Sequence, residues 1–345
     1  MTPALRLLLF PVLSTAAEQN AYLESVSTHA DAIGWHLGQT DMETFLPLML
    51  LFFEQVLKAL HGKLNFLTLA FDETFLPYYG KKGKESVWIH GYTNKIKGAT
   101  GSYKFMVVSI VMRNQRFVLF ALPMATTDSS VKMVDDMLTR IKREFHVSLV
   151  LLDRGFASKE LAYTMEQQNQ KYIALCPKWK NVKQFLKQGI TGICETKKVV
   201  HHRRETRVHM QYVLAYGLLE HDWVFLTNTT LTGMDLVRAY KARWGIETTF
   251  RVMDHADIKS KSTNIVIRSF FFLLSIVLYN LWIEQREELG MTFTQFLDAL
   301  AMANTSLDKV IEKVRSAKEA LGVALTAQEK RILSCRATEP ARVVA

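Results

Sequence analysis

Residues 64–71 read LNFLTLAF and are followed directly by Asp72. A short run that is almost entirely apolar predicts a strand buried on both faces. Residues 147–152, VSLVLL, repeat this pattern and end at Asp153. Acidic residues at the carboxyl ends of such strands project into the crevice where α/β sheets bind ligands. The two stretches therefore predict a sheet with a candidate site at its edge.

The segments around these two strands complete a mixed sheet. Residues 103–112 and 116–122 predict an antiparallel pair joined by a short turn, and residues 171–176 predict a fifth strand. Residues 130–145 have apolar side chains at three- to four-residue spacing, which predicts an amphipathic helix. Strands that alternate with crossover helices indicate an α/β fold, with a mixed sheet flanked by helices.

The character of the chain changes several times, which predicts five consecutive parts. Short β-like pieces separated by basic residues indicate a β-rich insertion in the second half. The predicted parts are a helical N-terminal region at 1–62, a first core part at 63–176, the insertion at 177–232, a second core part at 233–285 and a helical C-terminal tail at 286–345.

Composition points to a polyanionic partner and to a reducing compartment. The chain of 345 residues has 43 Lys and Arg against 33 Asp and Glu, a formal net charge of +10, which favours nucleic acid. The three cysteines form no CxxC pair, so we expect the cytoplasm. The most apolar run, residues 269–283, is shorter than the roughly 18 to 20 residues of a membrane span, so we expect a buried helix and no membrane.

A third acidic residue, Glu247, follows the β-rich pieces in a segment with a helical pattern. At 100° per residue, Tyr240, Arg243, Glu247 and Arg251 share one helical face. This pattern is typical of an exposed helix with paired charges. It is also compatible with arginines and a tyrosine hydroxyl that bind DNA phosphates next to the carboxylate.

Three carboxylates from separate elements suit phosphoryl transfer. Asp72, Asp153 and Glu247 can together hold two divalent cations, and Mg²⁺ prefers a few carboxylate oxygens while it keeps water or phosphate as its other ligands. Two such ions assist the attacking and the leaving oxygen of a displacement. We therefore expect two Mg²⁺ or Mn²⁺ ions at these residues.

The motifs around the three acids resemble those of the DDE insertion-sequence transposases, in the branch with a Tyr-Arg-Glu-Lys signature. Tyr240, Arg243 and Glu247 match the spacing of that signature. The sequences DRGF from Asp153 and FDET around Asp72 are similar to the motifs of the second and first Asp. The resemblance covers about residues 64–285.

The resemblance implies a ribonuclease-H-like core with a β-rich insertion between the second Asp and the Glu. It also implies metal-dependent cleavage next to the element's 3′ end and attack of the freed 3′-OH on target DNA. Partners would be double-stranded DNA, as terminal inverted repeats and target, and a second copy of the chain in a homodimer. Some members flip a base onto a tryptophan of the insertion, for which Trp223 and Trp179 are candidates.

Basic residues supply candidates for DNA contact. Basic stretches occur at residues 81–84, 95–97, 178–180 and 201–204, and together they favour phosphate contacts. The residues assigned to DNA binding are Tyr240, Arg243, Arg251, Lys259, Lys261, Arg203 and Arg204.

Two other functions are compatible with parts of this pattern. Asp254 stands where the resembled family has its Lys, which favours a truncated or decayed transposase that binds DNA without cutting it. Paired carboxylates are also typical of glycosidases, which would need a neutral or acidic cleft lined with aromatic residues. The arginines that flank Glu247 favour the transposase over the glycosidase.

Overall fold

A computed structural model describes residues 35–300, except for 36, 63, 65, 82–86, 92–95, 113–114, 190, 202–203, 220 and 254–261. The chain divides into two compact units, which are described separately. Residues 43–251 form one unit, and residues 1–42 with 252–345 form the other. The predicted candidate residues from Asp72 to Arg251 belong to the first unit.

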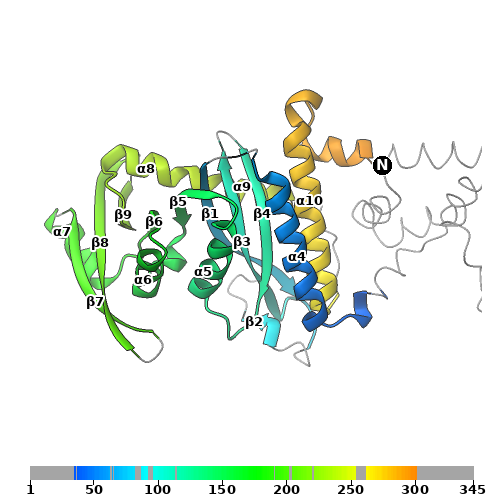
Figure 1. The fold of residues 1–345 in the computed structure, drawn as a ribbon, viewed down its shortest axis with the longest axis horizontal. Coiled ribbons are helices and arrows are strands. Elements are labelled where there is room, and N and C mark those ends of the chain that lie inside the picture. Colours follow the sequence, from blue (N-terminus) through cyan, green and yellow to red (C-terminus); the bar gives the residue numbers. More distant parts are fainter. Residues whose placement is uncertain are drawn as a thin grey trace, which may run out of the picture. The chain divides into compact units, whose positions relative to one another are not determined.

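A mixed sheet organises the unit of residues 43–251. Its strands run in the order β2-β3-β1-β5-β6-β9-β8-β7, and β4 pairs with β3. Figure 1 shows the strands following one another from β4 to β7. The strands are β1 (Phe66–Tyr78), β2 (Ile89–His90), β3 (Gly101–Met112), β4 (Gln115–Met124), β5 (His146–Leu152), β6 (Tyr172–Leu175), β7 (Ile193–His201), β8 (Arg204–Leu218) and β9 (His221–Thr227).

Helices surround this sheet and connect its strands. The predicted helix at 130–145 is confirmed as α5, which ends earlier than expected. The helices of this unit are α4 (Met42–Leu60), α5 (Ser130–Ile141), α6 (Lys159–Gln167), α7 (Lys180–Gln188), α8 (Gly233–Lys241) and α9 (Gly245–Met253), with short 3-10 turns η3 (Arg154–Phe156) and η4 (Ala242–Trp244).

The register at the centre of the sheet places the two predicted aspartates next to each other. Strand β1 pairs in parallel with β5, and Phe71 lies opposite Leu152. The residues that follow in the two strands are Asp72 and Asp153. The last three residues of each run, 69–71 and 150–152, are completely buried, because helices cover both faces of the sheet here.

The two faces of the sheet are covered by different helices. Helix α8 packs on the face that includes Ala70 and Leu151, where Trp223, Phe225 and Tyr240 complete a buried cluster. Side chains alternate between faces along a strand, so Asp72 and Asp153 point to this same face as Ala70 and Leu151.

The opposite face of β1 carries Glu73. Its carboxylate accepts a hydrogen bond from the Ser130 hydroxyl, at the first residue of α5, and forms an ion pair of 2.7 Å with the amine of Lys104. Helix α5 therefore covers the face away from Asp72. A further helix, α4, packs on β4, where the rings of Phe53 and Phe120 stack with centroids 4.7 Å apart.

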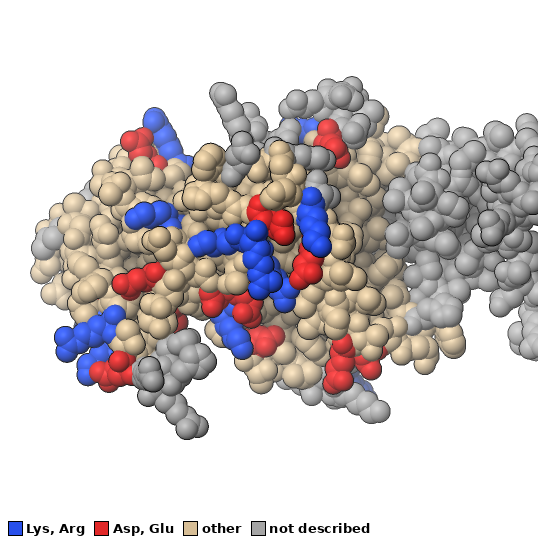
Figure 2. All heavy atoms as spheres, viewed as in Figure 1, with Lys and Arg blue, Asp and Glu red and all other residues tan. Residues whose placement is uncertain are grey.

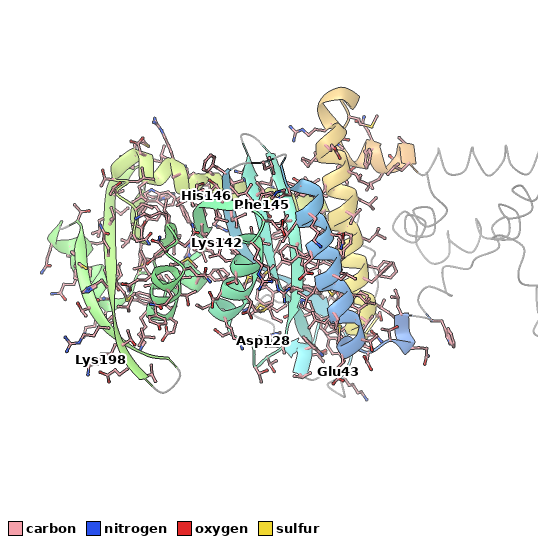
Figure 3. All side chains as sticks on the ribbon, in the orientation of Figure 1. Glu43, Asp128, Lys142, Phe145, His146 and Lys198 are labelled. Carbon is pink, nitrogen blue, oxygen red and sulfur yellow. The ribbon has the colours of Figure 1, made fainter. Side chains whose placement is uncertain are left out.

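The predicted β-like pieces of residues 177–232 form the strands β7, β8 and β9. These strands continue the central sheet through the antiparallel pair of β6 and β9. Figure 3 shows Lys198 at the end of the hairpin formed by β7 and β8, far from Glu43 at the start of α4. The segment also contains a helix, α7, which the sequence pattern did not predict.

The second unit contains α10 (Ile265–Leu289), which confirms the predicted apolar helix at 269–283. It is longer than the sequence pattern indicated. The window Ile265–Glu284 is long and apolar enough to cross a membrane, by length and composition alone, and 56% of it is buried. Core helices of soluble proteins pass the same test. Residues 1–34 and 301–345, which include most of both predicted helical extensions, lie outside the described residues.

Candidate active site

The two aspartates reach the site from different positions in their strands. Asp153 directly follows the last residue of β5, as expected. Asp72 was expected at the end of its strand, but β1 continues to Tyr78, so this expectation is wrong. The polar residues after Asp72 remain in the strand because β3 pairs with them as far as Tyr78. Asp72 nevertheless lies where the pairing of β1 with β5 stops, because its parallel neighbour β5 ends at Leu152.

The predicted continuous helix from Tyr240 to Arg251 is interrupted. Helix α8 ends at Lys241, a 3-10 turn occupies Ala242–Trp244, and α9 begins at Gly245. A 3-10 turn is wound more tightly than an α-helix, so the 100° spacing does not hold across it. Tyr240 and Arg243 both point into the protein toward the aspartates, whereas Arg251 is exposed.

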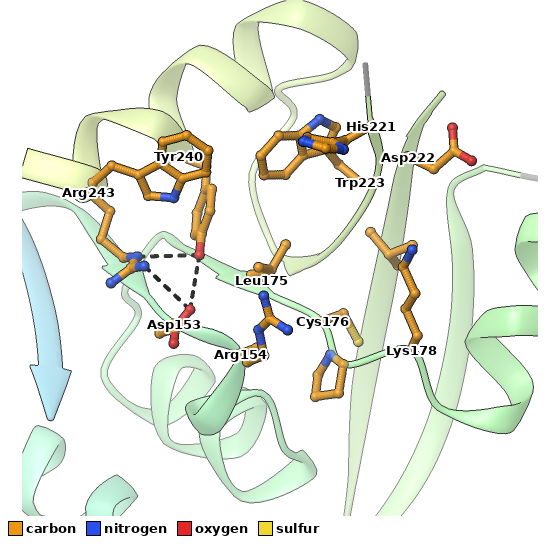
Figure 4. Close-up of a pocket in the computed structure, with 13 residues that line it drawn as sticks. Asp153, Arg154, Leu175, Cys176, Lys178, His221, Asp222, Trp223, Tyr240 and Arg243 are labelled. Carbon is orange, nitrogen blue, oxygen red and sulfur yellow. Dashed lines mark hydrogen bonds and ion pairs between the residues drawn. The ribbon is translucent and has the colours of Figure 1, made fainter. Parts of the chain in front are cut away.

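Four side chains form a connected polar cluster on this face of the sheet. The guanidinium of Arg243 donates from Nη1 to Oδ2 of Asp72 at 2.9 Å, and its Nη2 lies 3.4 Å from Oδ1 of Asp153. The Tyr240 hydroxyl donates to the same Asp153 oxygen at 3.3 Å and accepts from Nε of Arg243 at 3.3 Å. Figure 4 shows the triangle of Arg243, Tyr240 and Asp153.

Burial and charge fix the protonation of the two residues from α8 and η4. Burial alone would lower the pKa of the Arg243 guanidinium, but Tyr240, Asp72 and Asp153 together raise it above its ordinary value. Burial raises the pKa of the Tyr240 phenol far above its ordinary value, against the opposing effect of Arg243, and Asp153 raises it further. Arg243 is therefore a cation and Tyr240 a neutral donor throughout the physiological pH range.

A cavity of about 670 Å³ opens beside Asp153. It lies between the start of α7, strand β9 and the turn η4, and Figure 4 shows its wall. The residues that line it are Asp153, Arg154, Leu175, Cys176, Pro177, Lys178, His221, Asp222, Trp223, Val224, Tyr240, Arg243 and Trp244.

Of the two tryptophans that line this cavity, sequence reasoning named Trp223 and overlooked Trp244. Trp223, one of the two tryptophans proposed for base stacking, is 5% exposed and donates from its indole nitrogen to the Leu218 carbonyl at 2.8 Å. Trp244 is the more accessible aromatic, at 41% exposure, and the Lys241 amine lies 4.8 Å from the centre of a Trp244 ring. The sequence could have indicated Trp244 as a site residue, because it directly follows Arg243.

The other predicted site residues fall into two groups. The backbones of Glu247 in α9 and Arg204 in β8 are described, but their side chains are not. The residues that lie outside the described residues altogether are Arg203, Asp254, Lys259 and Lys261.

The two aspartates could provide part of a site for divalent cations. Two carboxylates from adjacent strands face the same side and already share one cationic neighbour, Arg243. Oxygen ligands of this kind fit Mg²⁺ or Mn²⁺. Among the residues whose side chains are described, no group of three or more His, Cys, Asp and Glu is placed to hold a metal. Glu247, whose side chain is not described, is the predicted third carboxylate.

A family model described as the transposase DDE domain matches residues 66–281. The matched segment covers more than half of the chain. This chain belongs to the DDE transposase domain family. No curated protein matches it. The match begins at the first residue of β1 and extends into α10, so the whole central sheet of strands β1 to β9 lies within the transposase domain.

Gly245, the first residue of α9, permits a close contact with Arg116 of β4 in the transposase domain. Its φ is helical, but a Cβ at this position would lie 2.6 Å from Nε of Arg116, whose guanidinium donates to the carbonyl of Ala242. Alanine would favour the helix by about 1 kcal/mol, and overpacking costs about 1 to 3 kcal/mol. We expect Gly245→Ala to lower the free energy of unfolding by about 1 kcal/mol, measured in urea.

A variant of the contact partner, Arg116→Ala, tests whether crowding against the Arg116 guanidinium causes the loss of stability in Gly245→Ala. In an Arg116→Ala background the Gly245→Ala substitution meets no guanidinium, so it should become neutral or stabilising. A Gly245→Ala effect of the same size in both backgrounds would show that the contact with Arg116 is not the cause.

Proposed function

We propose that the protein is a DNA transposase of the Tyr-Arg-Glu-Lys branch, which cleaves DNA at the ends of its element and joins the freed 3′-OH to target DNA. The observation that carries this proposal is the convergence of Asp72 and Asp153 on one face at the edge of the sheet, within reach of one guanidinium. Membership of the DDE transposase domain family supports it.

Asp72, Asp153 and Glu247 would hold two Mg²⁺ or Mn²⁺ ions. When bound, these ions supply stabilisation of the attacking and the leaving oxygen in an in-line displacement at phosphorus. The protein residues keep the carboxylates oriented. Strand pairing of β1 with β5 fixes the backbones of the two aspartates, and the Tyr240 hydroxyl holds Oδ1 of Asp153 by its hydrogen bond.

The cavity beside Asp153 is suited to a DNA strand. Arg154 and Lys178 contribute exposed cations to its wall, and Trp244 contributes an accessible ring. Cations that contact phosphates and aromatic rings that stack on bases are the usual means of holding a single strand. Trp244 is better placed than the buried Trp223 to receive an extruded base.

Helix α7 continues this basic wall away from the cavity. Lys180, Lys183 and Lys187 are exposed on it, while Val182 anchors its other side in the core. Their spacing of three and four residues places them on one face. Figure 2 shows Lys and Arg side chains with acidic side chains among them over the centre of one side of the molecule, whereas Figure 1 places α7 at the left edge of the same view. We assign the three lysines to contacts with DNA phosphates.

The remaining assignments belong to the same proposal. Arg251 is exposed and available to DNA, and Arg203, Arg204, Lys259 and Lys261 are further candidates for phosphate contact. Pairing of two DNA ends calls for a homodimer in the DNA complex. The location would be the cytoplasm, in association with the nucleoid.

The direct test is a strand-cleavage assay with the full chain and DNA that carries the inverted repeats flanking its reading frame. We expect nicking at the repeat ends with Mg²⁺ or Mn²⁺, no nicking with EDTA, and joining of the 3′ ends to a target plasmid. Binding of this DNA without cleavage in either metal would establish the decayed transposase instead.

The lysines of α7 give a prediction about affinity. A variant with Lys180, Lys183 and Lys187 changed to Gln should bind DNA more weakly. Each lost phosphate contact reduces the slope of log affinity against log salt by about 0.9. Fluorescence anisotropy at several salt concentrations should therefore show a slope shallower by about 2 to 3.

A matched control removes three charges elsewhere. Lys58, Lys132 and Arg143 are exposed on α4, on α5 and just after α5, on the parts of the unit that cover the other face of the sheet. Changing these three to Gln should leave the salt slope nearly as in the wild type. An equal loss in both triple variants would indicate an effect of net charge rather than a contact surface on α7.

A further inference from the structure

The guanidinium of Arg243 occupies the space between the two aspartates. Asp72 accepts from it through Oδ2 at 2.9 Å, while Oδ1 of Asp72 accepts from the backbone N–H of Glu73 at 2.9 Å. Oδ1 of Asp153 has Nη2 of Arg243 at 3.4 Å and also accepts from Tyr240. Each aspartate therefore has one carboxylate oxygen in contact with Arg243, and a metal ion held by these two oxygens would have to displace the guanidinium.

The surroundings of Arg243 explain why its side chain stays there. Arg243 is 2% exposed, and a buried cation needs anionic partners to offset its lost hydration. Asp72 and Asp153 provide them, and Tyr240 adds a hydrogen bond and a ring face 5.6 Å from the guanidinium carbon. Two carboxylates that face the same side repel each other. The guanidinium offsets this repulsion, because it forms an ion pair with both carboxylates.

We propose that Arg243 is a positioning residue that takes the place of a divalent cation in the DNA-free protein, so that metal loading depends on DNA. The guanidinium and the metal compete for Oδ2 of Asp72 and Oδ1 of Asp153. Competition keeps metal affinity low as long as the Arg243 guanidinium stays with these two carboxylates. This inference rests on the proposed function, because it takes Asp72 and Asp153 as metal ligands.

DNA relieves the competition because it brings phosphate oxygens to the site. A phosphate can accept bidentate hydrogen bonds from the Arg243 guanidinium in place of its present contacts with the two carboxylates, and phosphate oxygens also serve as ligands of Mg²⁺. DNA and metal then each raise the affinity for the other, as linkage between two sites requires. The protein would hold few metal ions until a DNA end is in place, which restricts cleavage to assembled complexes.

The opposite role for Arg243 predicts the opposite sign. If the guanidinium only orients the carboxylates toward a metal, its removal should weaken metal binding in the DNA-free protein. If it substitutes for the metal, its removal should strengthen that binding. The sign of the change in metal affinity therefore separates the two roles, and it needs no measurement of activity.

The experiment is a titration of the full chain with Mn²⁺ in the absence of DNA, with free Mn²⁺ followed by electron paramagnetic resonance. We expect Arg243→Gln to bind Mn²⁺ about tenfold more tightly than the wild type, since a hydrogen bond between charged groups is removed from the competing state. Arg243→Lys keeps a cation and should lie between the two. Equal or weaker binding by Arg243→Gln would overturn the proposal.

Two controls identify the site of the effect. Arg238→Gln removes the same charge from an exposed position on α8 and should leave Mn²⁺ affinity unchanged. Asp153→Asn in the Arg243→Gln background should abolish the gain. A gain that persists without the Asp153 carboxylate would place the bound Mn²⁺ elsewhere and would contradict the competition.

Tyr240→Phe provides an independent variant that keeps the arginine. It removes only the hydroxyl that holds Arg243 and Asp153, so Mn²⁺ affinity should rise in the same direction by a smaller factor. Thermal unfolding of each variant confirms that it is folded. If Arg243→Gln is unfolded, an unchanged Mn²⁺ affinity in folded Tyr240→Phe overturns the proposal.

Titrations with the terminal DNA present distinguish failure of this inference from failure of the proposed function. The wild type should bind Mn²⁺ more tightly with DNA than without it, and the difference should shrink in Arg243→Gln. If DNA has no effect on Mn²⁺ affinity but Asp153→Asn abolishes binding, the metal site stands and the competition is wrong. If no variant binds Mn²⁺ with or without DNA, the metal site itself is wrong.

Discussion

Asp153→Asn is expected to abolish strand cleavage while DNA binding persists. The substitution keeps the shape of the side chain but removes the charge of a proposed metal ligand at the end of β5, where 36% of the side chain is exposed. Loss of the stabilisation that metal ions provide to both oxygens should lower the single-turnover rate by at least about a thousandfold. Rates are measured with saturating Mg²⁺ and affinity by anisotropy with the same DNA.

Asp235→Asn is the matched control, because Asp235 lies on α8 with 77% of its side chain exposed and contacts only Arg238 among the ion pairs of the described residues. Its cleavage rate should equal that of the wild type. Glu247→Gln should lose activity as Asp153→Asn does. Full activity in Glu247→Gln would show that another residue is the third ligand.

Asp72→Ala is expected to destabilise the fold as well as to impair strand cleavage. It removes the ion pair of 2.9 Å between the buried Arg243 guanidinium and Asp72, while the contacts with Asp153 and Tyr240 remain. Removal of one partner from a buried pair costs about 3 kcal/mol or more, because the remaining charge loses its compensation. Urea unfolding of the full chain, followed by tryptophan fluorescence, measures the change in the free energy of unfolding.

A double variant tests the cause of this loss. Arg243→Met in the Asp72→Ala background removes the uncompensated cation and keeps an apolar side chain of similar length, so it should restore part of the lost stability. If the loss of unfolding free energy in the double variant equals the sum of the losses in Asp72→Ala and Arg243→Met alone, Asp72 and Arg243 are not coupled. Thr68→Ala on the same strand is a control for general damage to β1, and it should cost much less.

Most of the strands were predictable because their residues carry the signal themselves. The apolar runs before Asp72 and Asp153 form parallel neighbours in β1 and β5, as the pattern of a doubly buried strand indicates. The antiparallel pair of β3 and β4 was also predicted, with ends within a few residues of the observed ones. Patterns of this kind depend only on residues close together in the sequence.

The errors occurred where distant contacts decide the local structure. The segment from Tyr240 to Arg251 has a uniform helical pattern, yet a 3-10 turn at Ala242–Trp244 interrupts it, where Arg116 of β4 binds the carbonyl of Ala242. Strand β1 extends past Asp72 because β3 pairs with it. Neither partner can be recognised from the sequence of the segment that it alters.

The sequence by itself determined the order of the strands along the chain, the residues of the acidic set and the resemblance to transposases. Only the tertiary structure decided that Arg243 lies between Asp72 and Asp153 rather than on an exposed helix face. The physical reason is that a guanidinium finds its partners by burial and charge, and these partners lie 171 residues and 90 residues away in the chain. Strand pairing brings them together, and no pattern within α8 or η4 specifies that pairing.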